Sequence, residues 1–154
     1  MKEQHIPYTE SIVFAAEYLS RACTEYARKV IRENDFQLSY EEYFILDVVI
    51  FNPGLIQMDI AKKLFMQRSY LCKLLSKLED GGFISREKTI KGKRQSVIRV
   101  FATEKGIKIH RLMIKSFRKD VLQKPLIEHS KILEMTSDLF AMGDKIVNTF
   151  NLKL

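Results

Sequence analysis

A cluster of cationic and hydroxyl-bearing side chains stands out because its residue types and spacing suit contacts with nucleic acid. Arginine can pair with two acceptors of guanine at once, and ammonium and hydroxyl groups can bind phosphates or base edges. On one face of a helix, such side chains predict insertion into the major groove of DNA. The cluster comprises Arg68, Ser69, Tyr70, Lys73 and Lys77.

A second group of cations lies in a polar turn between two stretches rich in β-forming residues, 83–88 and 96–102. This order predicts a β-hairpin with a basic tip. The lysines are expected to contact phosphates, and the arginine is a candidate for insertion into a narrow minor groove. The group comprises Lys91, Lys93 and Arg94.

Charge is divided unevenly along the chain. The net charge is +7, from 26 Lys and Arg against 19 Asp and Glu. Residues 60–120 hold 17 of the basic and 5 of the acidic side chains, a net of +12, and the remainder has a net of −5. Concentrated positive charge predicts a polyanionic partner, because neutralising phosphates releases counterions. An anionic membrane fits less well, since every basic amphipathic segment also has a core-facing side.

Hydrophobic spacing and capping signals indicate the elements that must position these side chains. Leucines at 71, 74, 75 and 78 predict an amphipathic helix whose opposite face carries the first cluster. Ser39 and Glu42 form a capping box, Gly82 is expected to be left-handed after a helix end, and Thr103 can cap a further helix. The expected helices cover residues 9–33, 40–51, 56–64, 67–81, 104–123 and 126–150.

The 154 residues are enough for one substantial core, so a single domain is expected. The predicted fold class is mainly α (α+β): a helix-turn-helix followed by a β-hairpin wing, between long terminal helices. The first and last helices are too apolar to stand as solvated rods. They predict a homodimer in which each buries its apolar stripe against a second copy.

Other chemistry is weakly supported. No phosphate-binding glycine loop, metal-ligand cluster or catalytic arrangement emerges, so neither an enzyme nor a cofactor is expected. Cys72, beside Lys73, is a candidate redox residue, although a small, partly buried apolar role is favoured for it and for Cys23. No long apolar run or signal peptide is evident, which favours a cytosolic protein without a membrane segment.

With these residues in view, the chain resembles the MarR family of bacterial winged-helix regulators over nearly its whole length. The resemblance rests on the segment from Gly54 to Arg86, including Ile60-Ala61-Lys62-Lys63-Leu64, and on Thr103-Glu104-Lys105-Gly106. It implies one domain over 1–154, with dimerisation helices at 9–33 and 104–150 around a winged lobe at 38–102. It further implies a dimer on a pseudo-palindromic double-stranded operator.

The chain departs from the family pattern at three positions. Ile56 and Gln67 stand where Thr or Ser often caps the two helices of the motif, which should weaken each cap by about 1 kcal/mol. Gly92 replaces an acidic residue that steadies the wing arginine. A more mobile Arg94 is therefore expected, with Lys91 and Lys93 sharing its task.

The resemblance also implies a small-molecule effector. Other members bind phenolic or aromatic acids in the crevice between the dimer helices and the lobe. Aromatic residues at these spacings are also typical of core positions. The candidates are Tyr18, Tyr26, Phe36, Tyr40 and Tyr43.

The predicted function is sequence-specific transcriptional regulation. Repression is favoured by analogy with the family, because a dimer on an operator can occlude polymerase. Two alternatives stay open: a winged-helix module that binds an acidic protein, and an architectural DNA binder without sequence preference. Tyr70 either stacks on a sugar or thymine methyl or packs locally.

Overall fold

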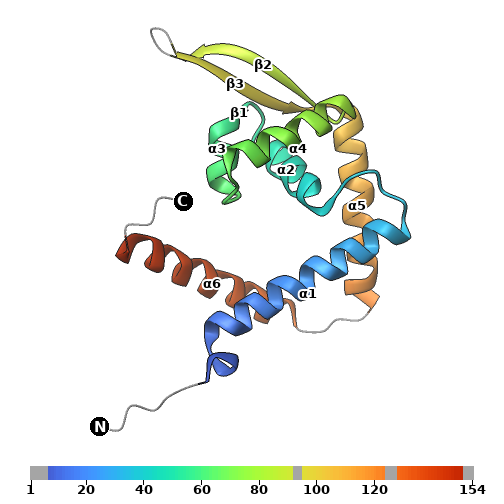
Figure 1. Ribbon diagram of the computed structural model, residues 1–154. Coiled ribbons are helices and arrows are strands. Elements are labelled where there is room, and N and C mark those ends of the chain that lie inside the picture. The colour runs from blue at the N-terminus through green and yellow to red at the C-terminus, as the bar shows by residue number, and fades with distance from the viewer. Residues whose placement is uncertain (1–6, 92–94, 124–127, 151–154) are drawn as a thin grey trace.

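A computed structural model describes residues 7–91, 95–123 and 128–150. A lobe of three helices and a small sheet stands above two long terminal helices, and one further helix joins the two parts along one side (Figure 1). The elements are η1 (Tyr8–Glu10, a 3-10 turn), α1 (Ile12–Glu33), α2 (Tyr40–Phe51), β1 (Leu55–Ile56), α3 (Gln57–Lys63), α4 (Arg68–Asp80), β2 (Ile84–Lys91), β3 (Gln95–Ala102), α5 (Glu104–Gln123) and α6 (His129–Thr149).

Local capping explains where several helices begin. The predicted capping box of α2 is present: Glu42 N–H donates to Ser39 Oγ over 3.1 Å, and Ser39 N–H donates to Glu42 Oε2 over 2.8 Å. The first helix begins at Ile12, not at residue 9, because Ser11 accepts from Phe14 N–H and so acts as its cap. Thr103 caps α5 as predicted, since Gly106 N–H donates to its hydroxyl.

The helix-turn-helix motif lacks such caps. Ile56 and Gln67 occupy the N-cap positions of α3 and α4, and neither side chain accepts a backbone hydrogen bond. The predicted helix 56–64 is shorter than expected, because Leu55 and Ile56 form strand β1 and Leu64 is a C-cap. Gly82 has a φ of +72°, which confirms the expected left-handed residue after α4.

The sheet is antiparallel with strand order β1-β3-β2. Strand β1, which the sequence reading missed, pairs Leu55 with Val100. The hairpin strands are longer than predicted, because Ile90 pairs with Ser96 and Lys91 pairs with Gln95. Residues assigned to a turn therefore extend the wing away from the lobe (Figure 1).

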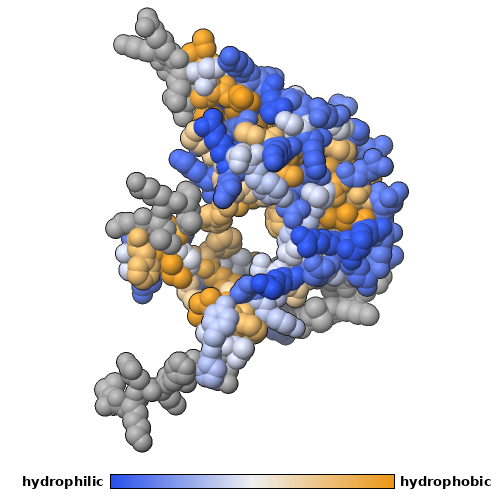
Figure 2. Space-filling view, in the orientation of Figure 1, coloured by the Kyte–Doolittle hydropathy of each residue, from blue (hydrophilic) through white to orange (hydrophobic). Residues whose placement is uncertain are grey.

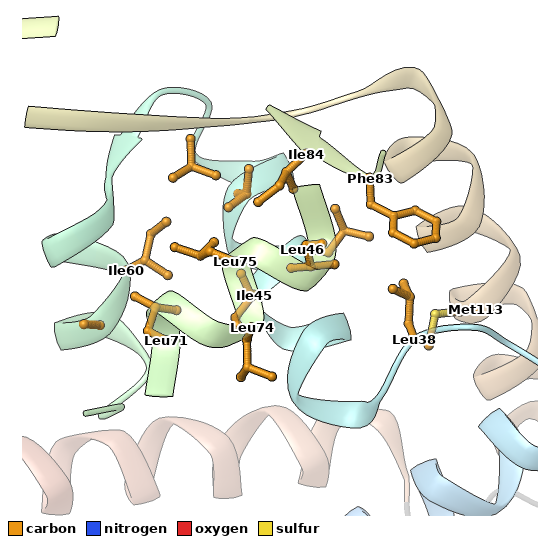
Figure 3. Close-up of a cluster of buried hydrophobic side chains, with 14 of the residues drawn as sticks. Leu38, Ile45, Leu46, Ile60, Leu71, Leu74, Leu75, Phe83, Ile84 and Met113 are labelled. Carbon is orange, nitrogen blue, oxygen red and sulfur yellow. The ribbon is translucent and has the colours of Figure 1, made fainter. Parts of the chain in front are cut away.

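One hydrophobic core fills the lobe. Side chains from α2, α3 and α4 meet those of the sheet and of α5 (Figure 3). Each apolar face contributes residues that lose all contact with water, which gives the lobe a single rigid centre. Side chains with no exposed surface are Ile45, Leu46, Val49, Ile60, Leu71, Leu75, Leu78, Val100 and Met113.

The terminal helices carry much exposed apolar surface, part of which is visible in Figure 2. None of the helices in the described ranges combines the length and the apolar character needed to cross a bilayer. The exposed large side chains are Ile12, Val13, Tyr18 and Leu19 on α1 and Leu133, Met135, Leu139, Phe140, Met142 and Ile146 on α6.

Candidate nucleic-acid interface

Helix α4 has two sharply different faces. Its four leucines are buried in the core, with Leu74 the most exposed of them at 5%. The opposite face is exposed to solvent, as the sequence predicts from their spacing. It carries Arg68, Ser69, Tyr70, Lys73 and Lys77.

This exposed face can form two kinds of contact with DNA. Arg68, Ser69, Tyr70 and Lys73 lie on the first turns of α4, where a helix in the major groove reaches base edges. Tyr70 is 46% exposed, so part of its side chain remains accessible from solvent. Lys77 lies a turn later, where a flexible ammonium group suits a phosphate.

The wing extends the basic surface beyond α4. Lys91 ends strand β2, whereas Lys93 and Arg94 lie outside the described residues. Lys88, also on β2, is exposed, and the sequence reading did not single it out. The alternation of side chains along the strand could have identified it, since it shares a face with Arg86 and Ile90.

A polar link fixes the wing to α4. Arg86 of β2 donates from its backbone N–H to Glu79 Oε1 over 3.0 Å and from Nε to Glu79 Oε2 over 2.8 Å. The same guanidinium lies 3.3 Å from Ser76 Oγ. These hydrogen bonds from Arg86 hold the pKa of Glu79 below its usual value. The carboxylate therefore stays charged, and the helix and strand keep one relative orientation.

A second set of contacts fixes the start of α3. Arg99 donates from a guanidinium nitrogen to the carbonyl of Gly54 over 2.8 Å, and Gly54 has a φ of +75°. Cys72 is half-buried, and Gln57 Nε2 lies 2.7 Å from its Sγ. The thiol thus lies between α3 and α4, and not wholly on the exposed face where Lys73 lies.

The aromatic residues predicted for an effector site lie on α1, on α2 and between these two helices. Tyr43 stacks on His110 at 5.4 Å, and burial, followed by the charge of Asp47, raises the pKa of Tyr43 to about 12. Phe36 and Tyr40 are partly buried and pack against the core.

The other two candidates are tyrosines of α1. The hydroxyl of Tyr26 donates to the carbonyl of Phe117 over 3.1 Å, which joins α1 to α5. Tyr18 is 69% exposed and stacks on Phe14. Tyr26 and Tyr43 both contact Phe117, whose ring lies 5.2 Å from that of Tyr43.

Comparisons with known proteins agree with this arrangement. Residues 36–95 match the model of the MarR family. The chain is 31% identical over 83 residues to the HTH-type transcriptional regulator YybA of Bacillus subtilis (strain 168). That match spans 54% of this chain and 54% of YybA, so it covers about half the length of this curated relative.

Solved structures show the same fold. The transcriptional regulator SlyA superposes with a TM-score of 0.72 at 23% identity, covering 92% of this chain and 97% of SlyA. FabT of Streptococcus pneumoniae, solved in complex with DNA, superposes with a TM-score of 0.67 at 23% identity, covering 90% of this chain and 99% of FabT. Over residues 36–95 the chain therefore matches the MarR family, and the order of its elements and the two-faced α4 agree with the fold of the solved transcriptional regulator SlyA.

Proposed function

We propose that this protein is a homodimeric transcriptional repressor that reads a pseudo-palindromic DNA operator with α4. The observation that carries the proposal is the exposed face of α4, which presents Arg68, Tyr70 and Lys73 while the leucines of the same helix anchor it in the core. A rigid helix with donors on its outer face suits direct readout in the major groove. The DNA complex of the similar FabT supports the same use of the fold.

Each exposed side chain has a distinct role in this proposal. Arg68 is the purine reader, because its planar fork can pair with both acceptors of guanine. Tyr70 stacks on sugar or a thymine methyl, and Ser69 and Lys73 contact nearby base edges or phosphates. Phosphate contacts that position the protein without reading sequence come from Lys77, Lys91 and Lys93, with Arg94 in the minor groove.

Dimerisation follows from the apolar faces of α1 and α6. Ile12, Val13 and Leu19 are exposed on α1, and Leu139 and Ile146 are exposed on α6. A second copy related by two-fold symmetry would bury both faces. Two lobes related in this way would place their α4 helices on successive half-sites of one operator.

A small aromatic or phenolic effector would release the repressor by preferring one of two dimer shapes. Phe36, Tyr40 and Tyr43 lie where the lobe meets α5 and α1. A change in dimer shape would alter the packing of the lobe against these helices. Tyr18, on the exposed face of α1, would join this region only through a partner copy.

Fluorescence-anisotropy titration tests the proposal. The purified protein is titrated with the intergenic DNA beside its own gene and with a scrambled duplex, across a salt series. We expect a steep salt slope and a preference of about a thousandfold or more for the native fragment. Equal affinity for both duplexes would contradict sequence-specific regulation at this site, and absence of binding at low salt would contradict DNA binding itself.

Two single variants separate readout from positioning. Arg68→Ala should cost about 1–3 kcal/mol on the native fragment and relax the preference for it. Lys77→Ala should weaken binding to both duplexes by the same factor and reduce the slope of log K against log salt by about one. The assignment of roles is wrong if the two variants show the same pattern.

A further inference from the structure

We infer that the outer face of α5 is a second DNA-docking surface, which holds the phosphate backbone of a duplex other than the one read by α4. This inference goes beyond the proposed function and does not require it. The residues, here called the α5 stripe, recur at spacings of three and four and are all exposed. The α5 stripe comprises Lys108, Arg111, Lys115, Arg118 and Lys119.

The α5 stripe is continuous because the opposite face of the same helix is buried. His110 and Met113 are 3% and 0% exposed, and Phe117 packs against the core one turn later. The stripe therefore cannot turn inward. Its residues lie along about 16 Å of helix axis, at a rise of about 1.5 Å per residue.

Among the described side chains, the cations of the α5 stripe form no ion pair with a carboxylate. On α1, cations pair with neighbouring carboxylates, as in Arg21 with Glu17 at 2.6 Å and Arg28 with Glu25 at 2.9 Å. Among the described residues, no carboxylate lies within 4.0 Å of a stripe cation. Like charges three and four residues apart destabilise a helix. An external polyanion would remove that repulsion.

The position of α5 separates the stripe from the reading surface. Helix α5 packs against α2, α1 and β3, on the side of the lobe opposite α3, and the wing points away from it (Figure 1). On this side of the molecule, Figure 2 shows hydrophilic surface interrupted by hydrophobic patches. One short duplex would have to bend to contact both α4 and α5, and bending a short site by about 40–90° costs about 1–6 kcal/mol. The occupant is therefore a second duplex.

The composition of the α5 stripe favours a phosphate backbone over an acidic protein. Protein interfaces depend on aromatic anchors and are depleted in lysine at their cores. The stripe has no aromatic residue, and Leu112 is the one large apolar side chain exposed beside it among the described residues of α5. One DNA strand carries a phosphate about every 3.4 Å of axis, so about five phosphates match the length of the stripe.

Three variants of the full chain test this surface. The stripe variant is Lys108→Gln, Arg111→Gln, Lys115→Gln and Lys119→Gln, which keeps good helix formers on α5. The matched control exchanges Lys for Arg and Arg for Lys at the same four positions, so the charge is kept. The reading variant is Arg68→Gln, Lys73→Gln and Lys77→Gln. Circular dichroism should show the same helix content in all of them.

The decisive assay is capture of a second duplex. Protein is loaded on an immobilised random-sequence duplex, and a fluorescent duplex of the same length is then added. The wild type and the charge-conserving control should retain the fluorescent duplex. The stripe variant should load on the first duplex equally but retain at least about tenfold less of the second. Equal retention by the stripe variant would overturn the inference and leave a solvated face.

Two further results separate this inference from the proposed function. If the reading variant binds the first duplex as well as the wild type, readout by α4 is contradicted, whereas the α5 stripe is still judged by whether the stripe variant loses only the second duplex. If polyglutamate binds the wild type but not the stripe variant, while duplex retention is unchanged, the surface binds acidic protein and the inference is overturned.

Discussion

Replacing Glu79 with alanine is expected to remove the contacts that hold the wing to α4 and to lower the stability of the protein. Arg86 would lose the acceptor of its backbone N–H at 3.0 Å and of its Nε at 2.8 Å, and keep only Ser76. A hydrogen bond to a charged group is worth about 1.5–3 kcal/mol. The Glu79 side chain is 35% exposed, so solvent screening keeps the total below the sum, and we expect a loss of about 2–3 kcal/mol.

Urea unfolding at neutral and acidic pH provides the assay, with protein concentration held constant because the stability of a dimer depends on it. The folded state lowers the pKa of Glu79, chiefly through the hydrogen bonds from Arg86. Its contribution is therefore complete above the unfolded value of about 4.3 and is lost as the pH falls through the folded value. The difference in the free energy of unfolding between the wild type and Glu79→Ala should therefore disappear at acidic pH.

Glu87→Ala is the matched control. Glu87 is an exposed carboxylate adjacent to Arg86 on β2, and among the described residues no cation forms an ion pair with it. Its loss should change the free energy of unfolding by no more than about 0.5 kcal/mol. The reasoning is refuted if Glu79→Ala is as stable as Glu87→Ala at neutral pH, or if its deficit is the same at every pH.

Three further changes test other parts of the fold by the same unfolding assay. Gln67→Ser should stabilise the protein by about 1 kcal/mol, because α4 has no side-chain cap. Gly106→Ala should destabilise it by about 3 kcal/mol, because the added Cβ would lie 2.1 Å from the carbonyl oxygen of Phe83. Tyr43→Phe should reduce the loss of stability on raising the pH from about 10 to about 12, because the folded state keeps the phenol neutral until about 12 while the unfolded chain ionises near 10. Absorbance of tyrosinate would follow that ionisation, and a normal titration of every tyrosine would contradict it.

The helices were predictable because their signals are local. Ser39 and Glu42 are three residues apart, and Thr103 caps the helix that follows it directly. The two-residue strand β1 was not predictable, because it exists only through pairing with Val100 and Arg99, far along the chain. The hairpin was predicted too short for a related reason, since polar residues such as Lys91 and Gln95 join a strand when a partner strand lies opposite them.

The outward face of α4 followed from the sequence, because four leucines identify the buried side and so its opposite. The contacts that orient this helix could not be predicted from the sequence, because Glu79 and Arg86 belong to different elements and no periodicity links them. Glycine is also required at position 106 because of a tertiary contact. This contact arises where α5 passes the backbone of Phe83, and a glycine within a helix pattern gives no sign of that approach.

Readout by α4 and wing together should depend on residues that do not touch DNA. The pair Glu79–Arg86 fixes the angle between helix and wing, and Arg99 holds the loop at Gly54 that leads into α3. In the proposed complex, a native operator would require contacts of α4 and of the wing at the same time, whereas nonspecific DNA would require only phosphate contacts. Glu79→Ala should therefore lose more affinity for the native fragment than for a scrambled duplex, although it makes the protein more positive. An equal gain in affinity for both duplexes would show that charge alone, and not the angle of the wing, determines binding.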